Sequence, residues 1–174
     1  MSIYIIGDTH FLHDNIKLYC NRPDGFEERV RTNLLYVLKK DDILIHLGDV
    51  CLGNAEFVHE YYIKPIRAIK ILLRGNHDKK TITWYYEHNW DFVVYRANYV
   101  YNGKRILLSH LPQMDMGQYD INIHAHFHNS EEKYHEDYLR EIKNDKQILY
   151  ALEYVGYKPI LLDSFLEEND DKSR

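Results

Sequence analysis

The chain has 174 residues, of which 45% are hydrophobic and 28% charged, and its formal net charge is −5 at pH 7. This composition is typical of a soluble globular protein, and we expect one domain over residues 1–174 with no membrane segment, because no apolar run reaches the roughly 18 residues that a spanning helix needs. Only two cysteines and no CxxC pair occur, which excludes a disulfide framework and favours the cytoplasm, and the negative charge argues against binding of nucleic acid by electrostatics alone.

Short apolar runs alternate with stretches of helical periodicity, which predicts an α/β protein. Strands are predicted, in chain order, over residues 2–6, 42–49, 68–76 and 120–123, and within residues 147–155. A hairpin is predicted over 95–110, because Asn102-Gly103 is a strong tight-turn signal between β-rich flanks. Helices are predicted over residues 26–39, 55–66, 79–88 and 131–144, with a short one after Pro159.

Side chains of the types that bind metal ions follow five successive predicted strands. In chain order, these residues are Asp8, His10, Asp49, Asn76, His77, His110, His126 and His128. Ligands of α/β proteins bind at the carboxyl ends of the strands, so we expect these side chains to share one site. Carboxylates, an amide and imidazoles suit Zn, Fe, Mn, Co or Ni, and they do not suit a cysteine-based structural zinc site.

Each block also has an ordinary explanation when it is taken singly. Gly-Asp at the end of a strand usually forms a turn, Asp-Thr-His can cap a helix, and His110 can be a loop histidine. The alternating His124, His126 and His128 can form an exposed strand face. These explanations would all have to hold at once, in this order and always at a strand end. We therefore favour the shared site.

Read together, the blocks GDTH, GD, GNHD, SH and HAHFH closely resemble those of the calcineurin-like metallophosphoesterases. The stretches GDTHFLHDNI, YCNRP and GYKPILLD resemble a small bacterial and phage-associated branch of that superfamily. One departure is Ala125, which replaces the glycine usual before the penultimate ligand histidine and is tolerated unless that backbone needs a positive φ. The resemblance implies a four-layer α/β/β/α sandwich of two mixed sheets over the whole chain.

The resemblance also implies two divalent transition-metal ions, for which we prefer Mn among Mn, Fe, Zn, Ni and Co. One ion would be held by Asp8, His10 and His128, and the other by Asn76, His110 and His126, with Asp49 bridging the two. If strand geometry continues to residue 128, the last two histidines project to one side, and each of two adjacent ions can take one imidazole. His124 then packs within the strand or supports a ligand, or has a direct catalytic role.

The implied reaction is phosphoester hydrolysis by a hydroxide that bridges the two metals, with Asp49 and His77 as the catalytic residues. His77 would protonate the leaving oxygen. Asp78 would either orient His77 or cap the helix that follows. We expect a phosphodiester or small nucleotide as the substrate. The alternatives are a nuclease of the same fold, acting on DNA or RNA, and a non-catalytic scaffold, which loss of ligands would mark.

Three residues after the first strand are predicted substrate contacts, and these are His13, Asn15 and Arg22. Arg22 would either bind a phosphate of the substrate or form a structural ion pair. His59 is expected to face solvent. The sequence leaves the oligomeric state open.

Overall fold

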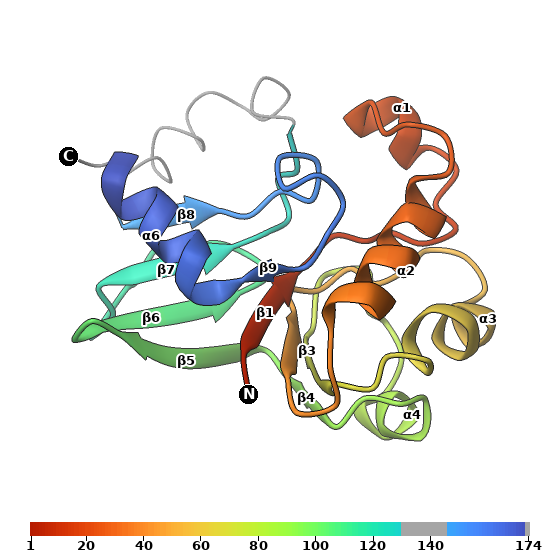
Figure 1. The fold of residues 1–174 in the computed structure, drawn as a ribbon, viewed down its shortest axis with the longest axis horizontal. Helices are drawn as coiled ribbons and strands as arrows, with labels where there is room; N and C mark the ends of the chain where they lie inside the picture. Colours follow the sequence, from red (N-terminus) through yellow and green to blue (C-terminus); the bar gives the residue numbers. More distant parts are fainter. Residues whose placement is uncertain (130–145, 173–174) are drawn as a thin grey trace.

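The computed structural model describes residues 1–129 and 146–172, and two mixed β-sheets form its centre (Figure 1). The first sheet has the order β4-β3-β2-β1-β9. Its strands are β1 (Ile3–Ile6), β2 (Ile43–His46), β3 (Ile69–Leu73), β4 (Phe92–Val94) and β9 (Ile160–Leu161). The first four strands are parallel, and β9 runs antiparallel to β1.

The second sheet has the order β5-β6-β7-β8. Its strands are β5 (Arg96–Tyr101), β6 (Lys104–Ser109), β7 (Ile121–His124) and β8 (Gln147–Leu149). β5 and β6 form the predicted hairpin, and β6, β7 and β8 are parallel. The α/β class with two mixed sheets is therefore confirmed, and the arrangement agrees with the expected sandwich.

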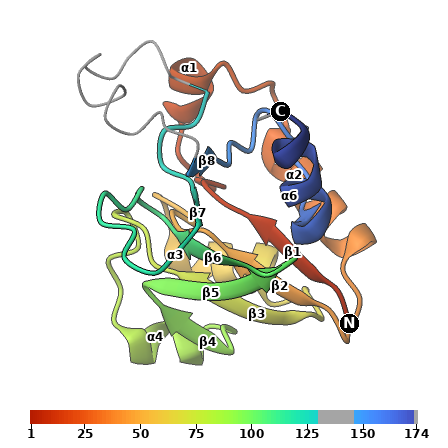
Figure 2. The same ribbon diagram turned by 90° about the vertical axis from the view of Figure 1, so that its left-hand side faces the viewer.

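Helices flank the sheets, and they are α1 (Ile16–Cys20), α2 (Phe26–Val37), α3 (Ala55–Val58), the π-helical turn η1 (His59–Ile63), α4 (Ile82–Glu87) and α6 (Leu162–Lys172). On α2, Phe26, Val30 and Leu34 are spaced by four residues and are buried on one face. α6 packs against β1 and β9, and Figure 2 shows α2 and α6 on the same side of β1. Within the part of the chain described, no helix is long and apolar enough to cross a membrane.

Several elements differ from the prediction. The helix predicted over 79–88 begins at Ile82, because the Thr81 side chain accepts a hydrogen bond from the Trp84 N–H and caps it. α1, β4 and β9 were not predicted, since each has five residues or fewer and shows no clear periodicity. The helix predicted over 131–144 lies outside the described residues.

The core connects the two sheets at the carboxyl ends of their strands. Ile5 and Ile6 of β1 belong to the same buried cluster as Ile123 of β7. Gly7 follows β1, and a Cβ atom on it would lie 2.9 Å from that of Leu47 and 3.4 Å from that of Ala125. Close packing there brings the loops after β1, β2 and β7 together.

Candidate metal centre

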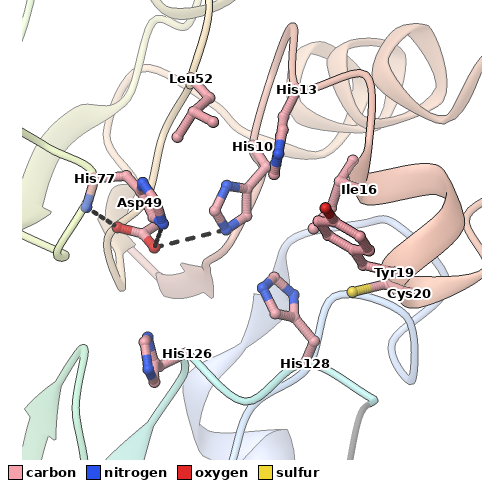
Figure 3. Close-up of a pocket in the computed structure, with 10 residues that line it drawn as sticks. All are labelled: His10, His13, Ile16, Tyr19, Cys20, Asp49, Leu52, His77, His126 and His128. Carbon is pink, nitrogen blue, oxygen red and sulfur yellow. Dashed lines mark hydrogen bonds and ion pairs between the residues drawn. The ribbon is translucent and has the colours of Figure 1, made fainter. Parts of the chain in front are cut away.

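The loops after β1, β2, β3, β6 and β7 carry the eight side chains singled out by sequence. Six of these side chains place their ligand atoms in two groups of three. In the first group, the ligand atoms of Asp8, His10 and His128 lie within 4.8 Å of one another. In the second group, those of Asp49, His110 and His126 do so as well. Figure 3 shows residues of both groups around one pocket.

Asp49 lies between the two groups. Its Oδ2 is 3.6 Å from His10 Nε2 in the first group and 3.4 Å from His110 Nε2 in the second. Asn76 joins the second group, with its Oδ1 2.9 Å from His110 Nε2. The structure thus brings all seven predicted ligands together and places one carboxylate oxygen between the groups.

The contacts of His110 fix the orientation of its ring. Its Nδ1 lies 2.8 Å from the carbonyl oxygen of Leu47, which can only accept, so Nδ1 donates to it. Its Nε2 faces Asp49 Oδ2 and Asn76 Oδ1, whose oxygens are electron-pair donors. A divalent cation would satisfy all three at once, and a carbonyl contact of this kind fixes the ring of a metal-binding histidine.

The first group carries buried polar atoms that also fit a cation. Among the described residues, Asp8 Oδ1 and both ring nitrogens of His10 are buried and have no hydrogen-bond partner. Leaving one such group unsatisfied typically costs about 1–3 kcal/mol. Burial lowers the pKa of His10, and it lowers the pKa of His126 to about 4. Both rings are therefore neutral near pH 7, the form that binds metals.

Burial also raises the pKa of Asp49 to about 7. The negative charge of the nearby Asp8 acts in the same direction, while His110 opposes it. A buried carboxylate beside another is stabilised as an anion by a bound cation. The donor set and the orphaned atoms of this site therefore fit a pair of divalent ions.

The local backbone is unusual at the ligands themselves. Five of the seven have a left-handed backbone, and these are Asp8, His10, Asp49, His126 and His128, with φ between 46° and 75°. Aspartate and histidine tolerate this region better than β-branched residues do. Gly75 has a different constraint, because a Cβ atom there would lie 2.1 Å from Asp49 Oδ1. Ala125 has no positive φ, which explains why alanine is tolerated there.

His77 differs from the ligands in its exposure. Its side chain is 40% exposed and its Nε2 lies 4.0 Å from Asp49 Oδ2. Its backbone N–H donates to Asp49 Oδ1 over 2.8 Å, which fixes the position of both residues. Partial burial and the nearby His110 lower the pKa of the His77 imidazole. The ring faces the pocket and is accessible to a substrate.

Both interpretations of Asp78 are wrong. Its carboxylate accepts hydrogen bonds from the backbone N–H groups of Asp49, Val50 and Gly75 over 2.8–3.1 Å. It therefore ties the loop after β2 to the loop after β3. The helix that follows is capped by Thr81 instead.

The pocket beside the two groups has a volume of about 390 Å³. Its lining consists of His10, His13, Ile16, Tyr19, Cys20, Asp49, Leu52, His77, His126 and His128. Of the three predicted substrate contacts, only His13 is among them. Asn15 is exposed elsewhere on the surface. The wall formed by α1 was missed, because its five residues carry no signal in the sequence.

Arg22 is turned away from the pocket and forms a structural ion pair. It is 4% exposed, and its Nε and Nη2 lie 2.8 and 2.7 Å from Glu153 Oε1. It also donates to the carbonyl oxygens of Asp8 and Thr9, over 2.7 and 2.9 Å. Its Nη2 lies 3.3 Å from His128 Nδ1. The guanidinium thus holds the backbone and a side chain of the first ligand group.

Glu153 was not singled out by sequence, since it lies in a turn region after β8 with no motif around it. Its Oε1 is 3.5 Å from His128 Nδ1, and with Cys20 it completes a third cluster of ligand-type atoms. The Arg22 guanidinium already neutralises this carboxylate. We therefore assign the cluster to the support of His128 and not to a further metal ion.

Two other histidines are packed in the interior. His124 Nδ1 donates to the carbonyl oxygen of Ala125 over 3.0 Å, and burial lowers its pKa to about 4. Its ring stands edge-on to Phe127. The expectation that His59 faces solvent is wrong. It is 1% exposed and packs 4.8 Å from the Trp84 ring, because α3 and η1 lie against α4.

Comparisons with known proteins bear on the fold and the family of the chain. A family model described as calcineurin-like phosphoesterase matches residues 1–171. An uncharacterized protein of Methanocaldococcus jannaschii is 32% identical over 172 residues, which cover 93% of this chain and 88% of that protein. The crystal structure of a protein of unknown function from Aquifex aeolicus has a TM-score of 0.71 and 29% identity, and the match covers 99% of each chain. Neither relative has a described activity, so they support the fold and not a substrate.

Proposed function

Because the chain belongs to the calcineurin-like phosphoesterase family, we propose that it hydrolyses small, nucleotide-like phosphodiesters with two divalent transition-metal ions. The observation that carries the proposal is the position of Asp49 Oδ2, within 3.6 Å of His10 Nε2 and 3.4 Å of His110 Nε2. A carboxylate oxygen between two groups of imidazoles and carboxylate or amide oxygens is suited to bridge two ions. Oxygen ligands in both groups favour Mn²⁺ among the candidates.

The ions would supply a water-derived nucleophile near neutral pH and offset the charge that develops on the phosphoryl group. The residues of the chain have separate roles around them. Asp8, His10 and His128 would hold one ion, and Asn76, His110 and His126 would hold the other. Asp49 would be shared by both ions, and Asp78 fixes the backbone of Asp49.

His77 is the proposed proton donor. Its ring is exposed to the pocket and is not needed as a ligand, since the neighbouring Asn76 supplies the oxygen near His110. A proton delivered to the leaving oxygen lets a poor leaving group depart. His13, which also lines the pocket, is a substrate contact in this proposal.

The shape of the pocket favours a diester. Figure 3 shows Tyr19 and Cys20 on one side of the ligands and His77 with Leu52 on the other. Both sides line the same pocket, so a phosphoryl group on the ions has room for one ester substituent in each direction. The free thiols of Cys20 and Cys51 suit the reducing cytoplasm, where we place the protein.

The proposal is tested with protein reconstituted separately with Mn²⁺, Zn²⁺, Fe²⁺, Co²⁺ and Ni²⁺. Each sample is assayed against phosphomonoesters, phosphodiesters, cyclic nucleotides and single-stranded oligonucleotides, with Asp49→Asn as the inactive control. We expect the highest kcat/KM for a small phosphodiester. A preference for long oligonucleotides would favour the nuclease alternative, and inactivity on every ester with both ions bound would favour the scaffold.

A further inference from the structure

A second cavity of about 470 Å³ adjoins the metal pocket and shares His77 and Leu52 with it. Its lining consists of Cys51, Leu52, Gly53, Ala55, His59, His77, Asp78, Lys79, Lys80 and Tyr85. Figure 3 shows the two shared residues on the side of the metal pocket away from Tyr19 and Cys20. The two cavities therefore meet at His77.

The second cavity carries positive charge that is not neutralised locally. Lys79 and Lys80 are exposed, and in residues 1–129 and 146–172 neither forms an ion pair with a carboxylate. The one acidic residue in the lining, Asp78, is 3% exposed and directs its carboxylate at backbone N–H groups. Lys80 Nζ lies 5.1 Å from the centre of the Trp84 ring.

The position of His77 indicates which part of the substrate the second cavity would hold. A general acid must reach the leaving oxygen, so the leaving group departs on the His77 side of the phosphoryl group. Lys79 lies two residues after His77, and its Cα is at most roughly 7 Å from that of His77. An anionic group attached to the leaving oxygen would therefore come within reach of the two lysines.

We propose that the cavity lined by Lys79 and Lys80 is a subsite for a leaving group that carries a phosphate of its own, as a nucleotide does. Lysine ammonium groups bind phosphate as point charges. The buried rings of His59 and Tyr85 form its floor. The assignment rests on the proposed function, since it uses His77 as the proton donor, and it narrows the substrate class to diesters of nucleotides.

The test is a binding measurement on protein that holds both metal ions. Isothermal titration calorimetry compares thymidine 3′,5′-bisphosphate with thymidine 3′-monophosphate and thymidine 5′-monophosphate at low ionic strength. We expect the bisphosphate to bind about 10-fold more tightly than either monophosphate, since two exposed charge contacts together contribute roughly this factor. The advantage should shrink as salt is added.

The variant Lys79→Gln/Lys80→Gln should reduce that ratio of affinities to near one. The matched control is Lys39→Gln/Lys40→Gln, which changes another adjacent, exposed lysine pair next to the amino end of β2. The control should keep the wild-type ratio. A ratio that is unchanged in Lys79→Gln/Lys80→Gln, or that falls equally in both double variants, would overturn the subsite.

Hydrolysis of bis(p-nitrophenyl) phosphate by the same samples distinguishes failure of the subsite from failure of the proposed function. Hydrolysis together with an unchanged ratio removes the subsite and leaves the proposed function standing. Absence of diester hydrolysis in a sample that holds both ions overturns the proposed function, and the leaving-group assignment falls with it.

Discussion

At the scale of single residues, the site separates side chains that are proposed to bind the ions from side chains that hold these proposed ligands in place. The His77 N–H donates to Asp49 Oδ1, and the His77 ring lies 4.0 Å from Asp49 Oδ2. The Asp49 carboxylate nevertheless lies between the two ligand groups, whereas the His77 ring is exposed to the pocket. Arg22 shows the opposite case, because a charged residue close in sequence to the ligands is 4% exposed and bonded only to the protein. Proximity in sequence to a ligand therefore does not establish contact with a substrate.

The first prediction is that His77 is needed for catalysis but not for binding of the metal ions. His77→Asn should keep both ions, and it should lose ~10²–10⁴-fold in rate on a nucleoside diester, whose leaving alkoxide needs a proton. The loss should be much smaller on a p-nitrophenyl ester, because that leaving group departs without one. The test compares the hydrolysis rates of the variant and the wild type on both substrates and the metal content of each protein. Equal losses on both would mean that His77 stabilises phosphoryl charge instead.

The second prediction concerns Arg22 as a residue that positions the first ligand group. Arg22→Lys keeps the charge, but its donors all lie on one nitrogen and cannot reproduce a guanidinium fork whose three nitrogens bond Glu153 and two carbonyl oxygens. We expect one of the two ions to bind about 10–100-fold more weakly, as is typical when a partner of a metal ligand is removed. The other ion should bind as in the wild type.

The measurement is competition with a chelator, followed as two separate binding steps. Arg31→Gln is the control, since Arg31 is a surface residue that bonds the Tyr61 carbonyl far from the site. A loss of substrate affinity in Arg22→Lys with metal affinity unchanged would restore Arg22 as a substrate contact.

At the scale of elements, strand ends and short helical turns determine where each histidine lies. β7 ends at His124, close to the predicted end of the strand, so the condition that strand geometry continues to residue 128 is not met. His126 and His128 have φ values of 75° and 52°, so the chain turns after the strand. The two rings nevertheless reach different ligand groups. The turn after β7, and not alternation along a strand, therefore places His126 and His128 beside the two groups.

The third prediction distinguishes these three histidines. His126→Ala and His128→Ala should each reduce metal occupancy and abolish turnover, because each removes a ligand from one group. His124→Ala should keep both ions and most of the activity, with a loss of stability from the cavity that it leaves. Elemental analysis and a diesterase assay test this. A loss of metal in His124→Ala as large as in its neighbours would show that the ligands are misassigned.

The fourth prediction concerns His59 in η1, whose pKa is lowered by burial from 6.5 to about 4. Between pH 4 and pH 6.5 the unfolded chain therefore binds a proton at His59 and the folded chain does not. Stability should therefore fall as the pH drops from 6.5 to 4, with a contribution of up to about 3 kcal/mol from this residue. His59→Phe should show a shallower fall.

Urea unfolding of the metal-free protein at pH 7.5 and pH 4.5 measures the effect, because removal of the ions keeps metal release out of the comparison. The difference between the two pH values should be smaller in His59→Phe than in the wild type. Identical differences in both proteins would mean that His59 accepts its proton without unfolding.

At the scale of the whole molecule, the site joins the two sheets. Asp8, His10, Asp49 and Asn76 follow strands of the first sheet, and the remaining three ligands follow strands of the second. The residues that gather at the site could be predicted from the sequence because their blocks are specific and each ends an apolar strand. The wall of α1, the partner Glu153 and the burial of His59 could not, because they depend on which distant segments pack together.

The central claim is that the chain holds two ions bridged by Asp49, and metal stoichiometry tests it most directly. Wild-type protein and Asp49→Ala are loaded with excess Mn²⁺, dialysed and analysed for metal per chain. We expect about two ions per chain in the wild type and nearly none in Asp49→Ala, because the variant removes the ligand that both ions share. One tightly held ion per wild-type chain, or one ion retained in Asp49→Ala with full affinity, would contradict the bridged pair.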